Sequence, residues 1–431
     1  MQKYFSYSLC VSVPLWLSLP SGCDRMRAMS DGTGTQMAAA TMHVGFDGAM
    51  LRTPHTGSGQ YSAALLGALT AFPDLSITVL TPVQLADRPR AVVAAPPRTL
   101  RGERMRKVWW EQVGVRVAAR RAGVQLIHTP YFAPPLIQHL PEVVTVHDVI
   151  PLKFPTYAGG RGMQAYLRLV SAGVRRATQV LTDSNHSRSD VIALLGLDPA
   201  RVTAVPLAAG PEFAAPPDAA AIARVRARLG LGERRIVFNV AGFDVRKNVD
   251  TLIRAYARAL PDIAEDVMLV LGGRAHGNPA LYPDPQPLVR ALGIETRICF
   301  PGALSAEERI ALYHTAACSV APSRYEGFGL TPLEAMASGV PVIAADASCT
   351  PEVTGDAALL VSPDDVDGFA RALIRVLTDD AFAADLVRRG HERAAHFSWA
   401  RTAAATVTVY RRVLGVRATE PVAEHMVEAA R

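Results

Sequence analysis

Several features that mark common classes of protein are scarce or missing in this sequence of 431 residues. Its five cysteines form no C-x-x-C pair and have no histidine at metal-ligand spacing, which predicts a reduced, cytosolic chain without structural zinc. The longest apolar run, residues 9–20, covers about a dozen residues, whereas a bilayer span needs roughly 20. Neither a D-x-D motif in a suitable context nor a nucleic-acid-binding motif is present, so we expect no metal and no nucleic-acid partner.

The composition predicts a folded protein of two or three domains. Hydrophobic residues make up 49% of the chain, and the net charge of +6 is small for this length, which excludes disorder over most of it. Residues 1–41 are the exception, because folded patterning begins at Met42 and several earlier methionines are alternative starts. We therefore expect a disordered or mis-started extension there. An export signal is the alternative, with Lys3 before the apolar run and Cys23 after it.

From Met42 onward, short β-branched runs alternate with helical patterns, which is typical of parallel sheets covered by helices. The alternation stops at 208–220, a segment rich in proline and alanine, and then restarts, so we place a domain linker there. The predicted domains are 42–207 and 221–395, followed by a helical segment, 396–431, that packs back on the first domain. The predicted strands are 42–48, 76–80, 125–129, 143–147, 179–183 and 202–206, then 235–241, 267–272, 297–300, 318–321 and 341–345. The main predicted helices are 59–70, 162–176, 248–260, 305–316 and 332–338.

The most informative loop is 322–339, PSRYEGFGLTPLEAMASG, because ligands of such sheets bind beyond the carboxyl ends of the strands. Its glycines permit a tight turn, and the helix that follows presents free N–H groups that attract an anion such as phosphate. Thr331 and Glu334 match a capping box, in which Glu334 would bond back to the Thr331 backbone. Glu326, beside the turn, has no capping role and is expected to bind hydroxyl groups.

A second loop, GFDVRKN at 242–248, places Arg246 and Lys247 just before a helix. Positive charge is unfavourable at a helix N-terminus, so this loop predicts an anionic ligand. The alternative is a pair of solvated surface cations.

Two signals in the first domain are weaker. Gly57 and Gly59 open a helix, but the third glycine and the acidic residue of the dinucleotide fingerprint are missing. His147 ends the strand 143–147, where its side chain either points into a cleft or has a structural role.

Taken together, these blocks resemble the family 4 retaining glycosyltransferases of the GT-B fold, from Met42 to about residue 415. The most specific match is the pair Glu326 and Glu334 within SRYEGFGLTPLEAMASGVPVIAAD. It is supported, in the family's order, by VVTVHDVIPLKFP, LTDSNHSRSD, GFDVRKN and TPEVTGDAALLVSP. The resemblance implies an α/β protein with two doubly wound, Rossmann-like domains that face each other across a cleft. The N-terminal domain would bind the acceptor and the C-terminal domain the nucleotide sugar.

The resemblance also implies roles for single residues. Glu326 would contact hydroxyls of the donor sugar, Lys247 the diphosphate and His147 the sugar near the reaction centre, so these three are the candidate catalytic residues. Glu334 would bind the ribose. Many members carry an arginine where this chain has Phe243, so the diphosphate contact rests on Lys247, with Arg246 as a second candidate. The remaining candidates, which approach the donor through the backbone, are Gly57, Gly59, Gly327, Phe328, Gly329 and Leu330.

The implied reaction is retaining transfer of a hexose, of mannose or glucose type, from a nucleotide diphosphate sugar to a saccharide or lipid-linked saccharide. Charge develops on the departing diphosphate, so preorganised donors such as Lys247 would replace a metal ion, and no cofactor is expected. The RYEGFG and TPEV segments resemble members that use GDP-mannose, with a UDP-hexose as the alternative. The acceptor is expected near residues 131–135. Competing hypotheses are a nucleotide-sugar epimerase or phosphorylase of the same fold and a non-catalytic scaffold.

The positive charge has a definite location. Between Arg98 and Arg121 lie eight cations and two acids, a surplus that equals the net charge of the whole chain. Trp109 and Trp110 lie among them. A basic helix with aromatic residues predicts peripheral contact with an anionic membrane, at its inner face, that carries a lipid-linked acceptor. The alternative is a solvated helix whose tryptophans pack inward.

Overall fold

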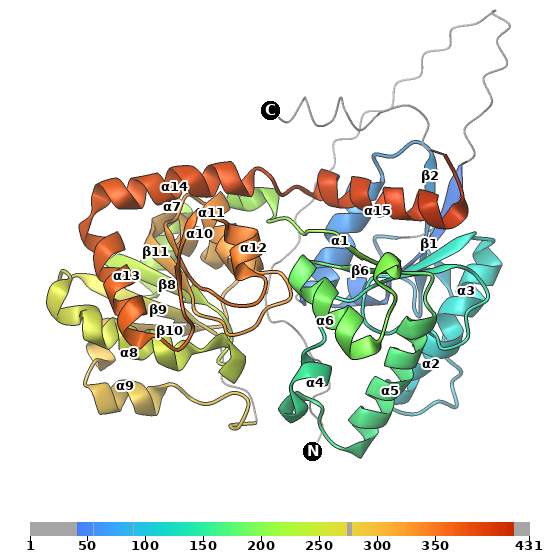
Figure 1. Cartoon of the computed structure of the whole chain (residues 1–431), viewed down its shortest axis with the longest axis horizontal. Helices are drawn as coiled ribbons and strands as arrows, with labels where there is room; N and C mark the ends of the chain where they lie inside the picture. The colour runs from blue at the N-terminus through green and yellow to red at the C-terminus, as the bar shows by residue number, and fades with distance from the viewer. Residues whose placement is uncertain (1–40, 55, 89, 274–277, 418–431) are drawn as a thin grey trace, which may run out of the picture.

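The computed structural model describes residues 41–417, except for residues 55, 89 and 274–277 (Figure 1). The predicted extension therefore lies outside the described residues, apart from residue 41, and so does the end of the predicted C-terminal segment. Two parallel sheets are present, one in each half of the chain, which confirms the predicted α/β class with two Rossmann-like domains. Strand order is β3-β2-β1-β4-β5-β6-β7 in the first sheet and β10-β9-β8-β11-β12-β13 in the second.

The first sheet forms from apolar runs that are buried on both faces, as parallel strands require. In β1, for example, Val44 and Phe46 on one face are fully buried, and Gly45 and Asp47 on the other face are buried too. Each strand predicted for this domain is present; β3 was not predicted, because two residues at a sheet edge leave no periodic pattern. The strands are β1 Met42–Asp47, β2 Leu75–Thr81, β3 Val92–Val93, β4 Leu126–Thr129, β5 Glu142–Thr145, β6 Gln179–Thr182 and β7 Val202–Ala204. The helices are α1 Gly57–Leu69, α2 Glu103–Trp109, α3 Val115–Ala122, α4 Ile150–Lys153, α5 Arg161–Arg176 and α6 Asn185–Leu195.

The second sheet has the same architecture. Its helix α8 buries Leu252, Ile253 and Tyr256 on one face, the spacing expected of an amphipathic helix. The strands are β8 Arg235–Val240, β9 Val267–Gly272, β10 Ile298–Gly302, β11 Ala316–Ala321, β12 Val342–Ala345 and β13 Ala358–Val361. The helices are α7 Ala219–Arg228, α8 Val249–Ala259, α9 Gln286–Leu292, α10 Ala306–Thr315, α11 Leu330–Ala337, α12 Thr350–Thr354, α13 Val366–Thr378 and α14 Asp380–Ala394.

Two segments connect the halves. Between β7 and α7, within 208–220, a short turn buries Phe213 against Tyr313 of α10, so this segment is packed. The last helix, α15 Trp399–Leu414, returns from the second half and lies on α1 (Figure 1). Its Tyr410 hydroxyl lies 2.6 Å from Nδ1 of the buried His128. Helix α15 thus joins the C-terminal part of the chain to the core of the first domain.

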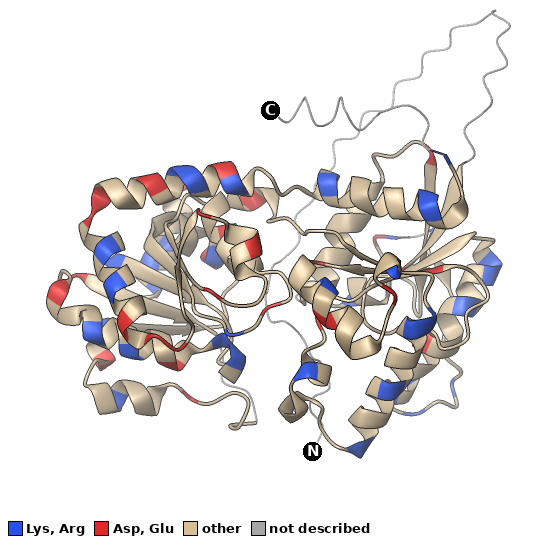
Figure 2. Ribbon diagram, in the orientation of Figure 1, with Lys and Arg blue, Asp and Glu red and all other residues tan. Residues whose placement is uncertain are grey.

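The basic segment 98–121 folds into α2, a π-helical turn at Trp110–Gly114 and α3. Trp110 is 2% exposed and its Nε1 donates to Asp47 Oδ1 at 3.0 Å. The inward-packing alternative is therefore correct for Trp110. Figure 2 shows lysine and arginine positions on α3 and on α5. Within the described ranges, no helix has the length and hydrophobicity that a membrane span requires.

Candidate active site

The carboxyl ends of the two sheets face each other, and polar loops from both lie at this junction. An apolar cluster anchors the halves beside it: Ile150 and Tyr157 from the first domain pack with Leu281 and Tyr325 from the second. The Tyr157 hydroxyl also donates to Asp244 across the junction. These contacts fix the position of the loops of one domain relative to those of the other.

The β8–α8 loop carries the two predicted cations in a fixed geometry. Asn248 adopts a left-handed backbone (φ 59°), and its side-chain amide donates to the carbonyl oxygens of Pro322 (3.0 Å) and Pro363 (2.6 Å). Asp244 accepts from the Arg246 N–H at 2.8 Å and so closes the turn before α8. This loop is thereby tied to the loop that follows β11.

Glu326 binds both cations. Lys247 Nζ lies 2.6 Å from Glu326 Oε1, and Arg246 Nη1 lies 3.2 Å from Glu326 Oε2. Burial alone would raise the pKa of the Glu326 carboxyl, but the charges of Lys247 and Arg246 outweigh burial and lower the pKa to about 2. The side chain of Arg246 is only 8% exposed, so the alternative of two solvated surface cations is wrong.

Helix α11 begins earlier than the capping pattern predicted. Gly329 takes a left-handed backbone (φ 94°) that only glycine adopts readily, so the helix starts at Leu330 and Thr331 lies inside its first turn. The predicted capping box of Thr331 and Glu334 is therefore wrong. A capping box does occur in α10, between Ser305 and Glu308.

The side chain of Glu334 instead turns toward α10 and is buried, with 5% of the residue exposed. Its Oε1 lies 3.6 Å from Nη1 of Arg309 on α10. Burial raises the pKa of Glu334, and the charge of Arg309 opposes that effect. Neither Nε nor Nη1 of Arg309 has a hydrogen-bond partner among the described residues. Sequence analysis missed Arg309, because its position on a helix carries no motif.

His147 lies at the end of β5 with its imidazole turned inward. Its Nδ1 is 2.8 Å from Asp183 Oδ2, at the end of β6, and the ring of Tyr61 lies edge-on to it with centroids 4.6 Å apart. Burial lowers the pKa of His147, but the charge and hydrogen bond of Asp183, with the charge of Asp148, outweigh burial and raise the pKa above its ordinary value. Asp183 lies in the block LTDSNHSRSD, but the sequence analysis gave it no role. Its position at the end of a strand next to β5 was the signal that could have placed it beside His147.

The backbone of Gly327 touches the backbone of His147 across the junction. A Cβ atom at position 327 would overlap the His147 carbonyl oxygen. Gly327 is thus required by the close approach of the two domains. The Glu326–Gly327 turn and the end of β5 are brought together, as the sequence blocks predicted.

The other backbone candidates lie around this junction. The side chain of Phe328 packs against Phe397, with ring centroids 5.8 Å apart, and Leu330 is half-buried. Gly57 and Gly59 form the first turn of α1, where Thr56 caps the Gly59 N–H at 3.1 Å. Helix α1 also supplies Tyr61, which reaches His147.

The segment 131–135, expected near the acceptor, is largely buried. Its Tyr131 is 6% exposed and donates to Asp47 Oδ2 at 2.6 Å. Within the described part of the chain, no three His, Cys, Asp or Glu side chains lie close enough together to hold a metal ion.

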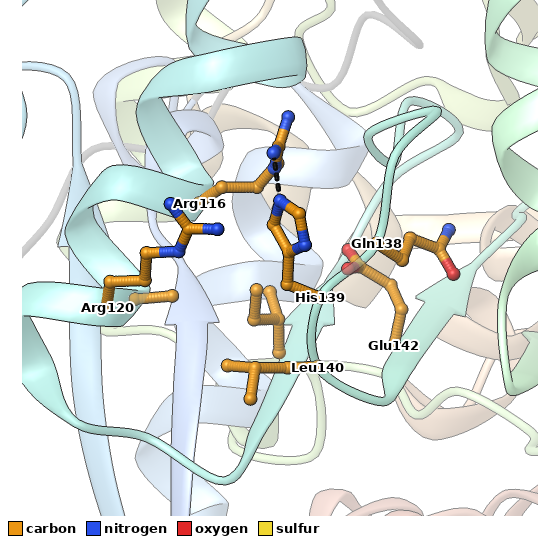
Figure 3. A pocket seen from close by; sticks show the side chains of 8 residues that line it. Arg116, Arg120, Gln138, His139, Leu140 and Glu142 are labelled. Carbon is orange, nitrogen blue, oxygen red and sulfur yellow. Dashed lines mark hydrogen bonds between the residues drawn. The ribbon is translucent and has the colours of Figure 1, made fainter.

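A small pocket lies elsewhere in the first domain, between α3 and the segment before β5 (Figure 3). Glu142, at the start of β5, is fully buried there, and burial raises its pKa to about 8. Arg116 contacts His139 at the rim. Because parallel strands run in one direction, this pocket lies at the opposite end of β5 from His147.

The sequence is similar to two family models and to several known proteins. The family model "Glycosyl transferases group 1" matches residues 222–393, and "Glycosyltransferase Family 4" matches residues 56–212. The chain is 30% identical over 270 residues to O-antigen chain mannosyltransferase B of Escherichia coli, covering 62% of this chain and 70% of that protein. It is also 30% identical over 281 residues to the serotype-specific mannosyltransferase WbdA of the same organism, covering 63% of this chain and 33% of WbdA. The chain thus spans about a third of the length of WbdA.

A solved structure of HepE from Anabaena, in complex with UDP and glucose, shares the fold. Its TM-score is 0.66 at 18% identity, and the match covers 86% of this chain and 100% of that one.

The contact between Gly327 and His147 predicts the effect of adding one methyl group. In Gly327→Ala, the new Cβ forces the halves apart or shifts the backbone, at a cost of about 1–3 kcal/mol. We expect a larger radius of gyration in small-angle scattering with unchanged circular dichroism. Gly67→Ala, where a Cβ meets no atom within 4 Å, is the matched control; it should keep the wild-type radius and, as an alanine inside α1, be at least as stable. An unchanged radius and stability for Gly327→Ala would contradict the close approach.

The His147–Asp183 pair predicts a pH dependence. Because the folded pKa of His147 is raised, its stabilisation is complete below the unfolded pKa and is lost as pH rises through the folded pKa. Asp183→Asn breaks a buried pair, so it should lower the free energy of unfolding by about 3 kcal/mol at pH 6 and by less at pH 9. Urea unfolding of wild type and variant at both pH values measures this difference. If the loss of unfolding free energy in Asp183→Asn stays constant or grows from pH 6 to pH 9, the pair is not charged.

Proposed function

Because the chain belongs to the group 1, family 4 glycosyltransferases, which are enzymes of GT-B fold, we propose that it transfers a mannose or glucose-type hexose from a nucleotide diphosphate sugar, with retention. The acceptor would be a saccharide or lipid-linked saccharide in polysaccharide or glycoconjugate synthesis. The observation that carries this proposal is the buried cluster of Lys247, Arg246 and Glu326 at the junction of the two sheets. It offers cations for a diphosphate beside a carboxylate for sugar hydroxyls.

The cluster supports a specific division of labour. Lys247 and Arg246 would receive the diphosphate, since a cation in a partly buried site interacts strongly with a phosphate oxygen. Glu326 would then exchange its cations for hydroxyl groups of the sugar. Glu334 would bind the ribose, because it lies in the first turns of α11, close to the free N–H groups that begin that helix. Gly327 to Leu330 would line the donor with backbone.

In the proposed reaction, the bond from the anomeric carbon to the diphosphate breaks while an acceptor oxygen attacks on the same face. The acceptor proton passes to the departing phosphate oxygen. Lys247, Arg246 and the α11 N-terminus stabilise the negative charge that develops there, which makes a metal ion unnecessary in this proposal. Closure of the domains would exclude water, which would otherwise hydrolyse the donor.

We propose GDP-mannose as the donor. The relatives named mannosyltransferases support mannose, whereas the UDP and glucose bound to HepE make a UDP-hexose the alternative. Mass spectrometry of products from a panel of GDP- and UDP-hexoses, with and without EDTA, tests the donor and the metal together. Product from GDP-mannose that persists in EDTA is the expected result; product from UDP-hexoses alone would overturn this donor.

Glu326→Gln should separate binding from transfer. Removing the carboxylate frees Lys247 and Arg246 from their ion pairs. Calorimetry should therefore show that GDP binds to the variant at least as tightly as to wild type. Transfer should fall about 100-fold, because the sugar loses a charged partner. Glu307→Gln, on the exposed N-terminal turn of α10, is the control and should keep full activity. Full transfer by Glu326→Gln would remove Glu326 from the site.

We further propose a cytoplasmic enzyme that contacts the inner face of an anionic membrane through residues 98–121. Arg98 and Arg101 are exposed, and so are the apolar side chains of Met105 (55%) and Val113 (40%). Cations beside exposed apolar residues suit a contact with the membrane interface. Because Trp110 is buried, the proposed contact rests on these cations and on Met105 and Val113.

Liposome flotation tests the membrane contact. Wild type should float with anionic vesicles and remain below with neutral ones, since each cation adds about 1 kcal/mol near the surface. The double variant Arg98→Glu and Arg101→Glu should lose flotation. Arg371→Glu, an exposed change on α13 of the other domain, should retain it. Equal flotation with both vesicle types would contradict an electrostatic contact.

A further inference from the structure

The N-cap and the first turn of α6 reach across the junction with two hydroxyl groups. Ser184 and Ser187 are fully buried, and both donate to the carbonyl oxygen of Gly327, at 2.7 and 2.8 Å. Ser184 is also the N-cap of α6 and accepts the Ser187 N–H at 3.0 Å. Capping uses Ser184 only as an acceptor. The hydrogen bonds that Ser184 and Ser187 donate to Gly327 of the other domain therefore have a separate role.

The carbonyl that these serines bind belongs to the residue after Glu326. On its other side, the Glu326 backbone is held within its own domain: its N–H donates to Ser348 Oγ at 3.0 Å. Ser348 has a left-handed backbone (φ 51°), a conformation that costs free energy outside glycine. The Glu326–Gly327 turn is therefore fixed by one hydroxyl of its own domain and by two from the opposite domain.

A second contact from the same loop supports this arrangement. Glu352, in the middle of α12, accepts from the backbone N–H of Asn185 (2.9 Å) and of His186 (3.2 Å). A carboxylate at these N–H groups is favoured by the free donors and the dipole of α6. Further along α6, Asp190 Oδ2 accepts from the Tyr325 hydroxyl at 2.7 Å. Helix α6 and its N-cap thus contact the opposite domain at three separate points.

We propose that Ser184 and Ser187 are positioning residues for sugar transfer: they orient the Gly327 peptide, and through it Glu326, against the first domain when the two domains close. The proposal rests on the proposed function. Hydrogen bonds that form only on closure assemble the site at the moment when substrate is enclosed. Neither serine contacts the reacting atoms. Their role is to give Glu326 the same place in each turnover.

Ser187→Ala tests this role most directly, because Ser187 is not the capping residue. We expect kcat to fall about tenfold, the effect of one hydrogen bond, with the donor KM within about twofold of wild type. The double variant Ser184→Ala and Ser187→Ala should lose about 100-fold in kcat. Ser189→Ala, which removes a hydroxyl bonded only to Asn185 O within the same helix, should leave kcat unchanged. Wild-type kcat in Ser187→Ala would overturn the proposal, and so would a loss confined to KM.

A measurement without turnover keeps this proposal separate from the proposed function. Small-angle scattering of the whole protein should give a larger radius of gyration for the double serine variant and for Glu352→Gln than for wild type and Ser189→Ala. Glu352→Gln acts from the opposite domain and leaves the buried serines intact, so α6 keeps its Ser184 N-cap in this variant. Equal radii in all four proteins would overturn the proposal. Absence of sugar transfer by wild type, with the expected radii, would refute only the proposed function.

Discussion

The ion pair of Lys247 with Glu326, 2.6 Å apart and partly buried, constrains much of the surrounding structure. Charges removed from water must be paired and hydrogen-bonded, or they destabilise the fold. The β8–α8 and β11–α11 loops therefore have to meet, and Asn248 holds them together through the carbonyl oxygens of Pro322 and Pro363. In the proposed function, Lys247 and Arg246 would also bind the diphosphate of the donor. Folding and donor binding would then use one cluster, with Glu326 as the partner that the diphosphate replaces.

The second constraint is the close approach of two backbones at Gly327 and His147. Each domain by itself presents polar loops at the carboxyl ends of its strands, as doubly wound sheets do. Contact between the domains adds a junction that neither has alone. The buried Asp183, 2.8 Å from His147, holds the end of β5, and the serines that follow it hold Gly327. One loop therefore touches both sides of the junction.

Local pattern predicted some parts of the site and not others. Glu326, Lys247 and Arg246 were found because carboxylate and cations at strand ends have no role in regular secondary structure. Glu334 was assigned to a capping box because the T-x-x-E spacing fits one. The left-handed backbone of Gly329 moved the helix start and left Glu334 facing Arg309. Arg309 and the serines of α6 were missed, because their partners are distant in sequence.

The sequence by itself determined the two sheets, the loops that end their strands and the chemistry of those loops. Alternation of apolar runs with helical patterns depends on neighbouring residues, so it can be read along the chain. Only the tertiary structure decided which charges pair, which way His147 turns and that Trp110 is buried against Asp47. These outcomes depend on burial and on contacts between segments far apart in the chain, such as His147 and Gly327. Neither burial nor such contacts follow from local pattern.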